Sequence, residues 1–141
     1  MTIRSKDFGL NVSRGLLLAS GLLAAGVGLA SLLAPDVFYA VYGIEIGSNV
    51  NLTNELKASA GVWVITALLA LQATVRTERV EPALGIAATV YLACGASRIL
   101  SVALDGIPDF TLVLATFVEL AIGAACLLRL SRIRRVATGV S

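Results

Sequence analysis

Four long apolar stretches, separated by short polar segments, set the pattern of the chain. They cover residues 15–34, 56–75, 83–104 and 109–130. Each has about the 20 residues that a helix needs to cross the hydrocarbon core of a bilayer. The pattern therefore predicts an all-α polytopic membrane protein with four transmembrane helices. Because the connections are short, successive spans should run antiparallel, in an up-down-up-down bundle.

A short aromatic segment follows the first span. Pro35 should end that span, and Asp36 is placed to cap a brief helix from Val37 to Tyr42 that Gly43 would end. Aromatic rings are typical of the membrane interface, so we expect this helix to lie there. Residues 1–14 and the basic residues 131–141 are predicted to be tails outside the membrane.

Capping residues mark the ends of the later spans. Asn54 is predicted to cap the second helix, with Glu55 in its first turn, where negative charge suits the helix dipole. Pro82 fits the first turn of the third helix. The sequence Asp105-Gly106-Ile107-Pro108 predicts a tight turn between the third and fourth spans.

Lysine and arginine are distributed unevenly among the segments between the spans. The two connections after the first and third spans contain only Lys57, near the start of the second span. The N-terminal tail, the middle connection and the C-terminal end, counted from the last turn of the fourth span, contain nine: Arg4, Lys6, Arg14, Arg76, Arg79, Arg129, Arg132, Arg134 and Arg135. Since basic residues favour the cytoplasmic side, both termini are predicted to be cytoplasmic.

The amino-acid composition argues against a water-soluble protein and against a nucleic-acid-binding protein. Of 141 residues, 57% are hydrophobic and 14% are charged, and the mean hydropathy is +0.89. The predicted solvent is therefore the lipid bilayer. A net charge of +2, without a basic surface interleaved with aromatic residues, gives no indication of nucleic acid binding.

The chain lacks histidine and has two cysteines, Cys94 and Cys126. Histidine is the commonest general base and transition-metal ligand. The cysteines are not in a Cys-x-x-Cys spacing, and their predicted depths differ too much for a disulfide. We therefore expect no enzyme activity, no cofactor and no metal site, and we expect both cysteines to be small core residues.

Two charged residues lie inside the predicted third and fourth spans. A charge near the centre of a bilayer costs about 2.5 to 3.5 kcal/mol on insertion scales, so such residues usually face the bundle and find partners. Arg98 and Glu119 lie at similar depths in an antiparallel hairpin, and their side chains lean toward each other. We therefore predict that they meet.

Further polar and aromatic residues lie near this predicted pair. One face of the third span carries Tyr91, Cys94, Arg98, Ser101 and Asp105. Glu55 begins a partly polar stripe on the second span, and Trp63 is expected either to anchor at the interface or to cover the polar site. The predicted site therefore comprises Arg98, Glu119, Glu55, Tyr91, Ser101, Asp105 and Trp63.

Small residues lie on one face of the first span. Gly21, Ala24, Ala25 and Gly28 follow helical spacing and would allow a close neighbouring helix. Packing inside the bundle is the simpler interpretation, and a homo-oligomer is the alternative.

Four short motifs occur in a characteristic order. Leu33-Ala34-Pro35 closes the first span, Asn54-Glu55-Leu56-Lys57-Ala58 opens the second, and Arg98 precedes Asp105-Gly106-x-Pro108, with Glu119 in the fourth span. Over about residues 12–130, the chain resembles a bacterial family of small four-helix membrane proteins of unknown function. It is also distantly similar to DoxX-type bundles. The resemblance implies a multi-pass protein of the bacterial inner (cytoplasmic) membrane and carries no activity with it.

Three functions remain open at this point, and the weakest of them is an enzyme or redox component. The first is an accessory or scaffold subunit of a larger membrane assembly, in which Arg98 and Glu119 only fix the helix register. The second is a binder or carrier of a small molecule, lipid or quinone through an outward-facing pocket at that pair.

Overall fold

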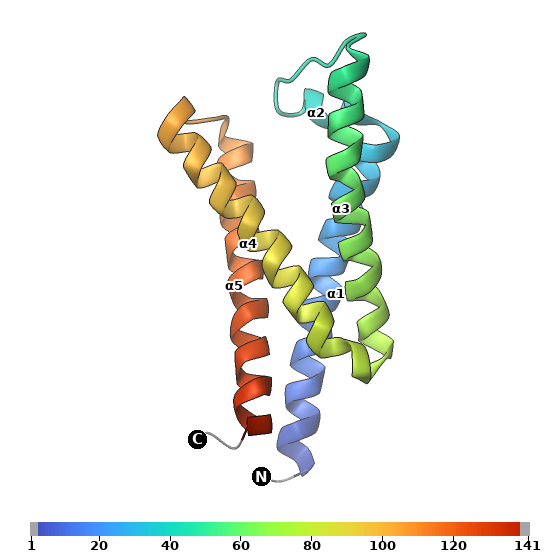
Figure 1. The fold of residues 1–141 in the computed structure, drawn as a ribbon, viewed down its shortest axis with the longest axis vertical. Coiled ribbons are helices and arrows are strands. Elements are labelled where there is room, and N and C mark those ends of the chain that lie inside the picture. Colours follow the sequence, from blue (N-terminus) through green and yellow to red (C-terminus); the bar gives the residue numbers. More distant parts are fainter. Residues whose placement is uncertain (1–2, 139–141) are drawn as a thin grey trace.

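The computed structural model describes residues 3–138 and is built from helices (Figure 1). In chain order these are α1 (Ile3–Leu33), α2 (Pro35–Ala40), α3 (Val50–Val75), the 3-10 turn η1 (Thr77–Arg79), α4 (Val80–Asp105) and α5 (Phe110–Thr138). Four of the helical segments are long and apolar enough to cross a membrane: Phe8–Leu33, Val50–Val75, Thr77–Asp105 and Phe110–Val136. The predicted all-α fold, with four spans and a short helix after the first, is confirmed.

The long helices extend past the apolar stretches at the end of the bundle that carries both termini. Helix α1 already begins at Ile3 and α5 continues to Thr138, so most of the residues assigned to tails are helical. No proline interrupts either segment. Each helix can therefore continue beyond the bilayer, where its polar side chains are in contact with water. The remaining tail residues, 1–2 and 139–141, lie outside the described residues.

Two predicted caps are wrong. Helix α3 begins at Val50, and its cap is Asn49, whose side-chain oxygen accepts a hydrogen bond from the Leu52 N–H at 3.0 Å. Asn54 therefore lies inside the helix. Helix α2 begins at Pro35 after Ala34, so Asp36 is in its first turn and does not cap it. In both cases the helix starts earlier because a residue nearer the N-terminus satisfies or removes the first free N–H groups.

The helices form two close hairpins, α1 with α3 and α4 with α5, and glycines allow this closeness (Figure 1). A Cβ added to Gly28 of α1 would lie 2.8 Å from the backbone nitrogen of Val64 in α3. In the second hairpin, a Cβ added to Gly123 would lie 2.9 Å from the backbone nitrogen of Leu92. The small residues of α1 thus pack inside the bundle.

The two hairpins meet at one end and diverge at the other (Figure 1). We call the end with the start of α1, the end of α5 and η1 the base, and the end with α2 and the α4–α5 turn the open end. Core residues between the hairpins include Leu17, Leu84, Tyr91 and Cys126, all fully buried. Large apolar side chains on the outside, such as Ile65 and Phe117, are more than half exposed, as expected for residues that face lipid.

Candidate functional site

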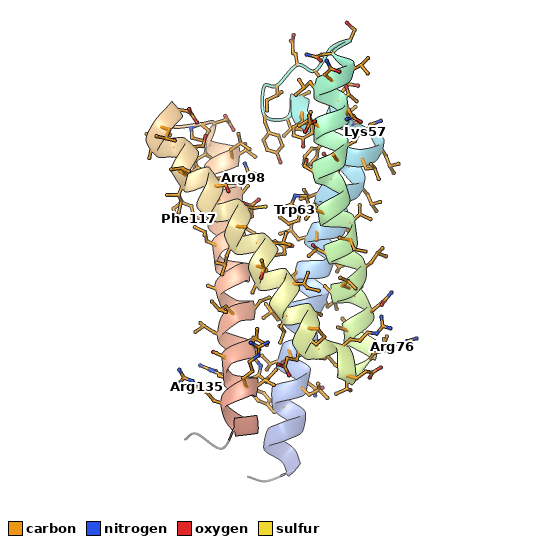
Figure 2. All side chains as sticks on the ribbon, viewed as in Figure 1. Lys57, Trp63, Arg76, Arg98, Phe117 and Arg135 are labelled. Atoms are coloured by element: carbon orange, nitrogen blue, oxygen red, sulfur yellow. The ribbon has the colours of Figure 1, made fainter. Side chains whose placement is uncertain are left out.

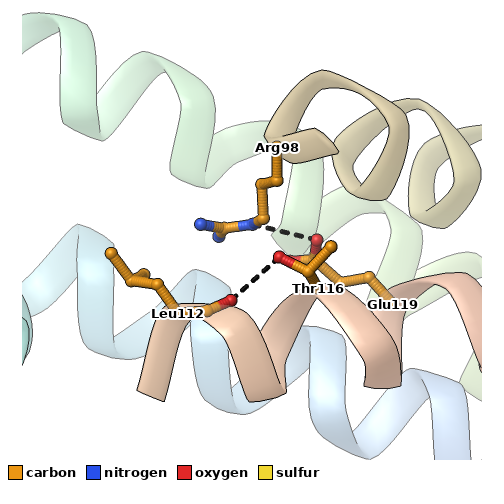
Figure 3. A network of polar contacts seen from close by, with 4 residues as sticks. All are labelled: Arg98, Leu112, Thr116 and Glu119. Atoms are coloured by element: carbon orange, nitrogen blue, oxygen red, sulfur yellow. Dashed lines mark hydrogen bonds and ion pairs between the residues drawn. The ribbon is translucent and has the colours of Figure 1, made fainter. Parts of the chain in front are cut away.

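Arg98 and Glu119 form an ion pair between α4 and α5 (Figure 3). The Nε atom of Arg98 donates a hydrogen bond to Oε2 of Glu119 at 3.0 Å. The carboxylate is buried, with a side chain 9% exposed, whereas the arginine side chain is 39% exposed. The predicted contact between these two residues is therefore present.

The α4–α5 turn and the close packing of the hairpin set this contact. Gly106, with φ 104°, ends α4 in a conformation that only glycine adopts readily. Asp109 accepts a hydrogen bond from the Thr111 N–H at 2.8 Å at the start of α5. Farther in, Gly95 packs against Leu120, because its missing Cβ leaves room for the leucine side chain. Arg98 is one turn from Gly95, and this places it opposite Glu119.

The ion pair uses only part of the hydrogen-bonding capacity of both side chains. Within residues 8–136, Arg98 donates no hydrogen bond from Nη1 or Nη2, and Oε1 of Glu119 accepts none. The nearby Thr116 hydroxyl is already engaged, because it donates to the Leu112 carbonyl at 2.9 Å (Figure 3). A carboxylate oxygen and two guanidinium nitrogens are thus left for another partner.

A cleft of about 240 Å³ lies between the hairpins and reaches Glu119. Every spanning helix contributes to its wall, and Tyr42, after α2, covers one side. Most of the wall is apolar or aromatic, and Glu119 is its charged residue. The lining consists of Leu23, Val27, Tyr42, Trp63, Tyr91, Thr111, Leu114, Ala115, Val118 and Glu119.

Tyr91 and Trp63 lie where the two hairpins separate. The Tyr91 hydroxyl donates to the backbone carbonyl of Ser20 in α1 at 2.6 Å. Its ring meets the Trp63 ring of α3 edge to face, with centroids 5.1 Å apart, and Figure 2 shows Trp63 on the side of α3 toward the second hairpin. Of the two roles expected for Trp63, the structure places its ring in the wall of the cleft.

Four of the seven predicted site residues do not line the cleft: Arg98, which is joined to it through its ion pair with Glu119, and three residues that lie farther away. Glu55 is exposed near the start of α3. Ser101 and Asp105 are exposed on α4, and the Ser101 hydroxyl donates to Oδ2 of Asp105 at 2.8 Å. They share a helical face with Arg98, but the hairpins diverge at this height, so no opposing helix covers them. Spacing along one helix did not reveal that divergence.

Several residues that line the cleft were not predicted from the sequence. Leu23 and Val27 of α1 resemble ordinary lipid-facing residues, and no local signal separates them. Tyr42 and Thr111 had weak signals, since each is a hydroxyl-bearing residue near the end of an apolar segment. The helical spacing of Thr111, Leu114, Ala115 and Val118 would have indicated one face of α5 beside Glu119.

The cysteines take no part in a disulfide. Cys126 is buried in the core and Cys94 is half-buried, and both are free. Residues 3–138 contain no group of three or more histidine, cysteine, aspartate or glutamate side chains that could hold a metal ion.

The family model described as Domain of unknown function (DUF4345) matches residues 12–130. The match covers most of the chain, so the protein belongs to this family, and the resemblance to a family of unknown function is confirmed. No curated protein and no solved structure matches the chain.

Proposed function

We propose that this member of the DUF4345 family is a non-enzymatic inner-membrane protein that binds a small apolar molecule with a polar head in the cleft between its hairpins. The observation that carries the proposal is a cleft lined by all four spanning helices that ends on the ion-paired carboxylate of Glu119. Ligand sites typically combine such apolar walls with a few fixed polar groups.

The unused polar atoms favour binding over a purely structural role. A pair that only fixes helix register would be expected to satisfy its buried atoms within the hairpin, because unsatisfied groups are costly in an apolar medium. Here Oε1 of Glu119 has no hydrogen-bond partner among residues 8–136 and remains accessible, although the side chain as a whole is only 9% exposed. A ligand with a polar head would supply the missing partner.

The position of the cleft supports entry from the bilayer or from the outer surface. The hairpins separate toward the open end, where Lys57 is the basic residue of the loops and the adjoining helix end (Figure 2). Arg76 and Arg135 lie toward the base. With the base in the cytoplasm, as the distribution of basic residues predicts, the cleft would open toward the outer leaflet.

The accessory-subunit role stays a prediction, and one observation favours it. A Cβ added to Gly26 of α1 or Gly61 of α3 would meet nothing within 4 Å, so both glycines leave small-residue surfaces free for another helix. Binding of a partner there would leave the cleft unaffected.

Native mass spectrometry in mild detergent distinguishes ligand binding in the cleft from the accessory-subunit role. We expect the purified protein to carry a bound small mass, and Ala115→Phe, which fills the cleft, to remove it. Ala121→Phe is the matched control, because Ala121 lies on the same helix and is exposed away from the cleft. A co-purifying protein without a small mass would favour the accessory subunit, and equal ligand retention in both variants would contradict binding in the cleft.

A further inference from the structure

We infer that the cleft prefers an uncharged molecule whose head carries a hydroxyl group, and that this hydroxyl donates a hydrogen bond to Oε1 of Glu119. The inference rests on the proposed function, because it names the chemical class of the ligand for the same cleft. It is drawn from the charge of the ion pair, its unused hydrogen-bonding atoms and the composition of the wall.

The charge of the site argues against an ionic head. Arg98 and Glu119 carry opposite charges with Nε and Oε2 3.0 Å apart, so the pair has no net charge. An ammonium head that approached Glu119 would also approach the Arg98 guanidinium, and an anionic head near Arg98 would also approach the carboxylate. Neither gain would offset the loss of hydration in an apolar cleft. An uncharged head avoids this cost.

The free atom of the pair requires a donor. Oε1 of Glu119 accepts no hydrogen bond from residues 8–136, and an ionised carboxylate can only accept. An ester or ether head has acceptors alone and would leave Oε1 unsatisfied. A hydroxyl supplies a donor without a charge, and a hydrogen bond to an ionised group is stronger than one between neutral groups.

The rim of the cleft fits the same class of molecule. Thr111 and Tyr42 line the cleft and each carries a hydroxyl, although the Thr111 side chain is also hydrogen-bonded to the Asp109 carboxylate at the start of α5. Thr111 lies eight residues before Glu119, so it is about 12 Å nearer the open end along α5. Between these two positions the wall is formed by Leu114, Ala115, Val118 and the aromatic rings. A mainly apolar body with a single inward hydroxyl is therefore the best match.

Trp63 offers a direct test, because it is the single tryptophan of the chain and lies in the wall of the cleft. The probes share one brominated alkyl chain, which quenches tryptophan fluorescence at short range, and differ in the head: hydroxyl, methyl ether, sulfate or trimethylammonium. Saturable quenching in detergent, reversed by the unbrominated alcohol, reports occupancy. We expect the alcohol to bind about tenfold tighter than the other three probes.

The variants separate the two proposals. Arg98→Leu/Glu119→Leu should still bind the chain but lose the preference for the hydroxyl probe. Glu119→Gln leaves the arginine charge unbalanced, so the sulfate probe should gain affinity while the trimethylammonium probe does not.

Saturable binding of all probes with equal affinity would overturn this inference and leave the cleft as a binding site. Absence of saturable quenching by every probe would overturn the proposed function itself. A hydroxyl preference that survives in the double variant would exclude Glu119 as the acceptor.

Discussion

The base and the open end connect the same two hairpins in different ways. At the base, Arg129 of α5 donates to the Ser13 hydroxyl at 3.0 Å and to the Gly9 carbonyl, both in α1. Arg14 of α1 also donates to the Thr77 hydroxyl in η1 at 2.9 Å. The Arg129 bonds cross between the hairpins, and the Arg14 bond joins the first hairpin to the connecting turn η1. The base is therefore held by polar bonds as well as by the core.

At the open end, the polar contacts remain inside each hairpin. Arg98 binds Glu119 within the second hairpin, and the Ser31 hydroxyl donates to the Tyr39 hydroxyl at 3.0 Å within the first. Between the Tyr91–Ser20 hydrogen bond and the open end, no hydrogen bond joins the hairpins among residues 3–138. Hydrogen bonds therefore join the two hairpins at the base and as far as Tyr91, and not at the open end.

The largest expected effect concerns the orientation of the two ends. In a background with Cys94 and Cys126 replaced by alanine, we expect a membrane-impermeant thiol reagent to label Ser48→Cys and Ile107→Cys from outside intact cells. Ser48 and Ile107 are exposed at the open end, and Glu78 is exposed in η1 at the base. Glu78→Cys should react only after the membrane is opened. Labelling of Glu78→Cys from outside would contradict the predicted topology.

The next largest effect concerns the ion pair of the open end. Arg98→Leu alone should lower the free energy of unfolding by about 3 to 5 kcal/mol, because it leaves the buried Glu119 carboxylate unpaired. Glu119→Leu alone should cost less, because the Arg98 side chain that it leaves unpaired is 39% exposed. The double variant should recover much of this loss, since packing can replace a buried pair. Thermal unfolding in detergent measures all three. Strictly additive losses would mean that the two side chains do not stabilise one another.

The polar bonds of the base should matter less than the buried pair. Arg129→Leu should lower the free energy of unfolding by about 2 kcal/mol, the usual loss of charged hydrogen bonds. Arg132→Leu is the matched control, because Arg132 is on the same helix and exposed. Distances between spin labels on α1 and α5 should widen at the base in Arg129→Leu alone. An equal effect of both substitutions would assign the loss to net charge.

Tyr91 lies at the boundary between the two ends, and its hydroxyl should contribute still less. Tyr91→Phe removes the hydrogen bond to the Ser20 carbonyl but keeps the ring beside Trp63. We expect a loss of about 1 kcal/mol in unfolding free energy, with Trp63 fluorescence little changed. A large change in fluorescence would instead indicate that the hydroxyl holds the hairpins in place.

The sequence predicted what depends on local pattern and missed what depends on helix tilt. Length and apolarity identified the four spans, and the short α4–α5 turn placed Arg98 opposite Glu119. Glu55 and Ser101 were assigned to the site because they share a helical face with residues that lie deeper. Helical spacing does not show that the hairpins diverge, since their angle depends on contacts between helices far apart in sequence, such as Tyr91 of α4 with Ser20 of α1 and Trp63 of α3.

The smallest expected effect concerns Asp109, which caps the start of α5 at the open end. The Thr111 N–H donates to the Asp109 carboxylate and, as the largest cause, holds the pKa of Asp109 below its ordinary value of 3.8. A carboxylate with a lowered pKa stabilises the fold above its ordinary pKa, and this stabilisation is lost as the pH falls through the lowered value. Asp109→Ala should therefore reduce the melting temperature slightly at neutral pH, and the difference from the unsubstituted protein should vanish well below pH 3.8.

Asp109→Asn is the control, because its amide caps the helix without a charge. The difference in melting temperature between Asp109→Asn and Asp109→Ala should therefore not depend on pH. A difference between Asp109→Ala and the unsubstituted protein that persists in acid would mean that the carboxylate does not act through its ionised form.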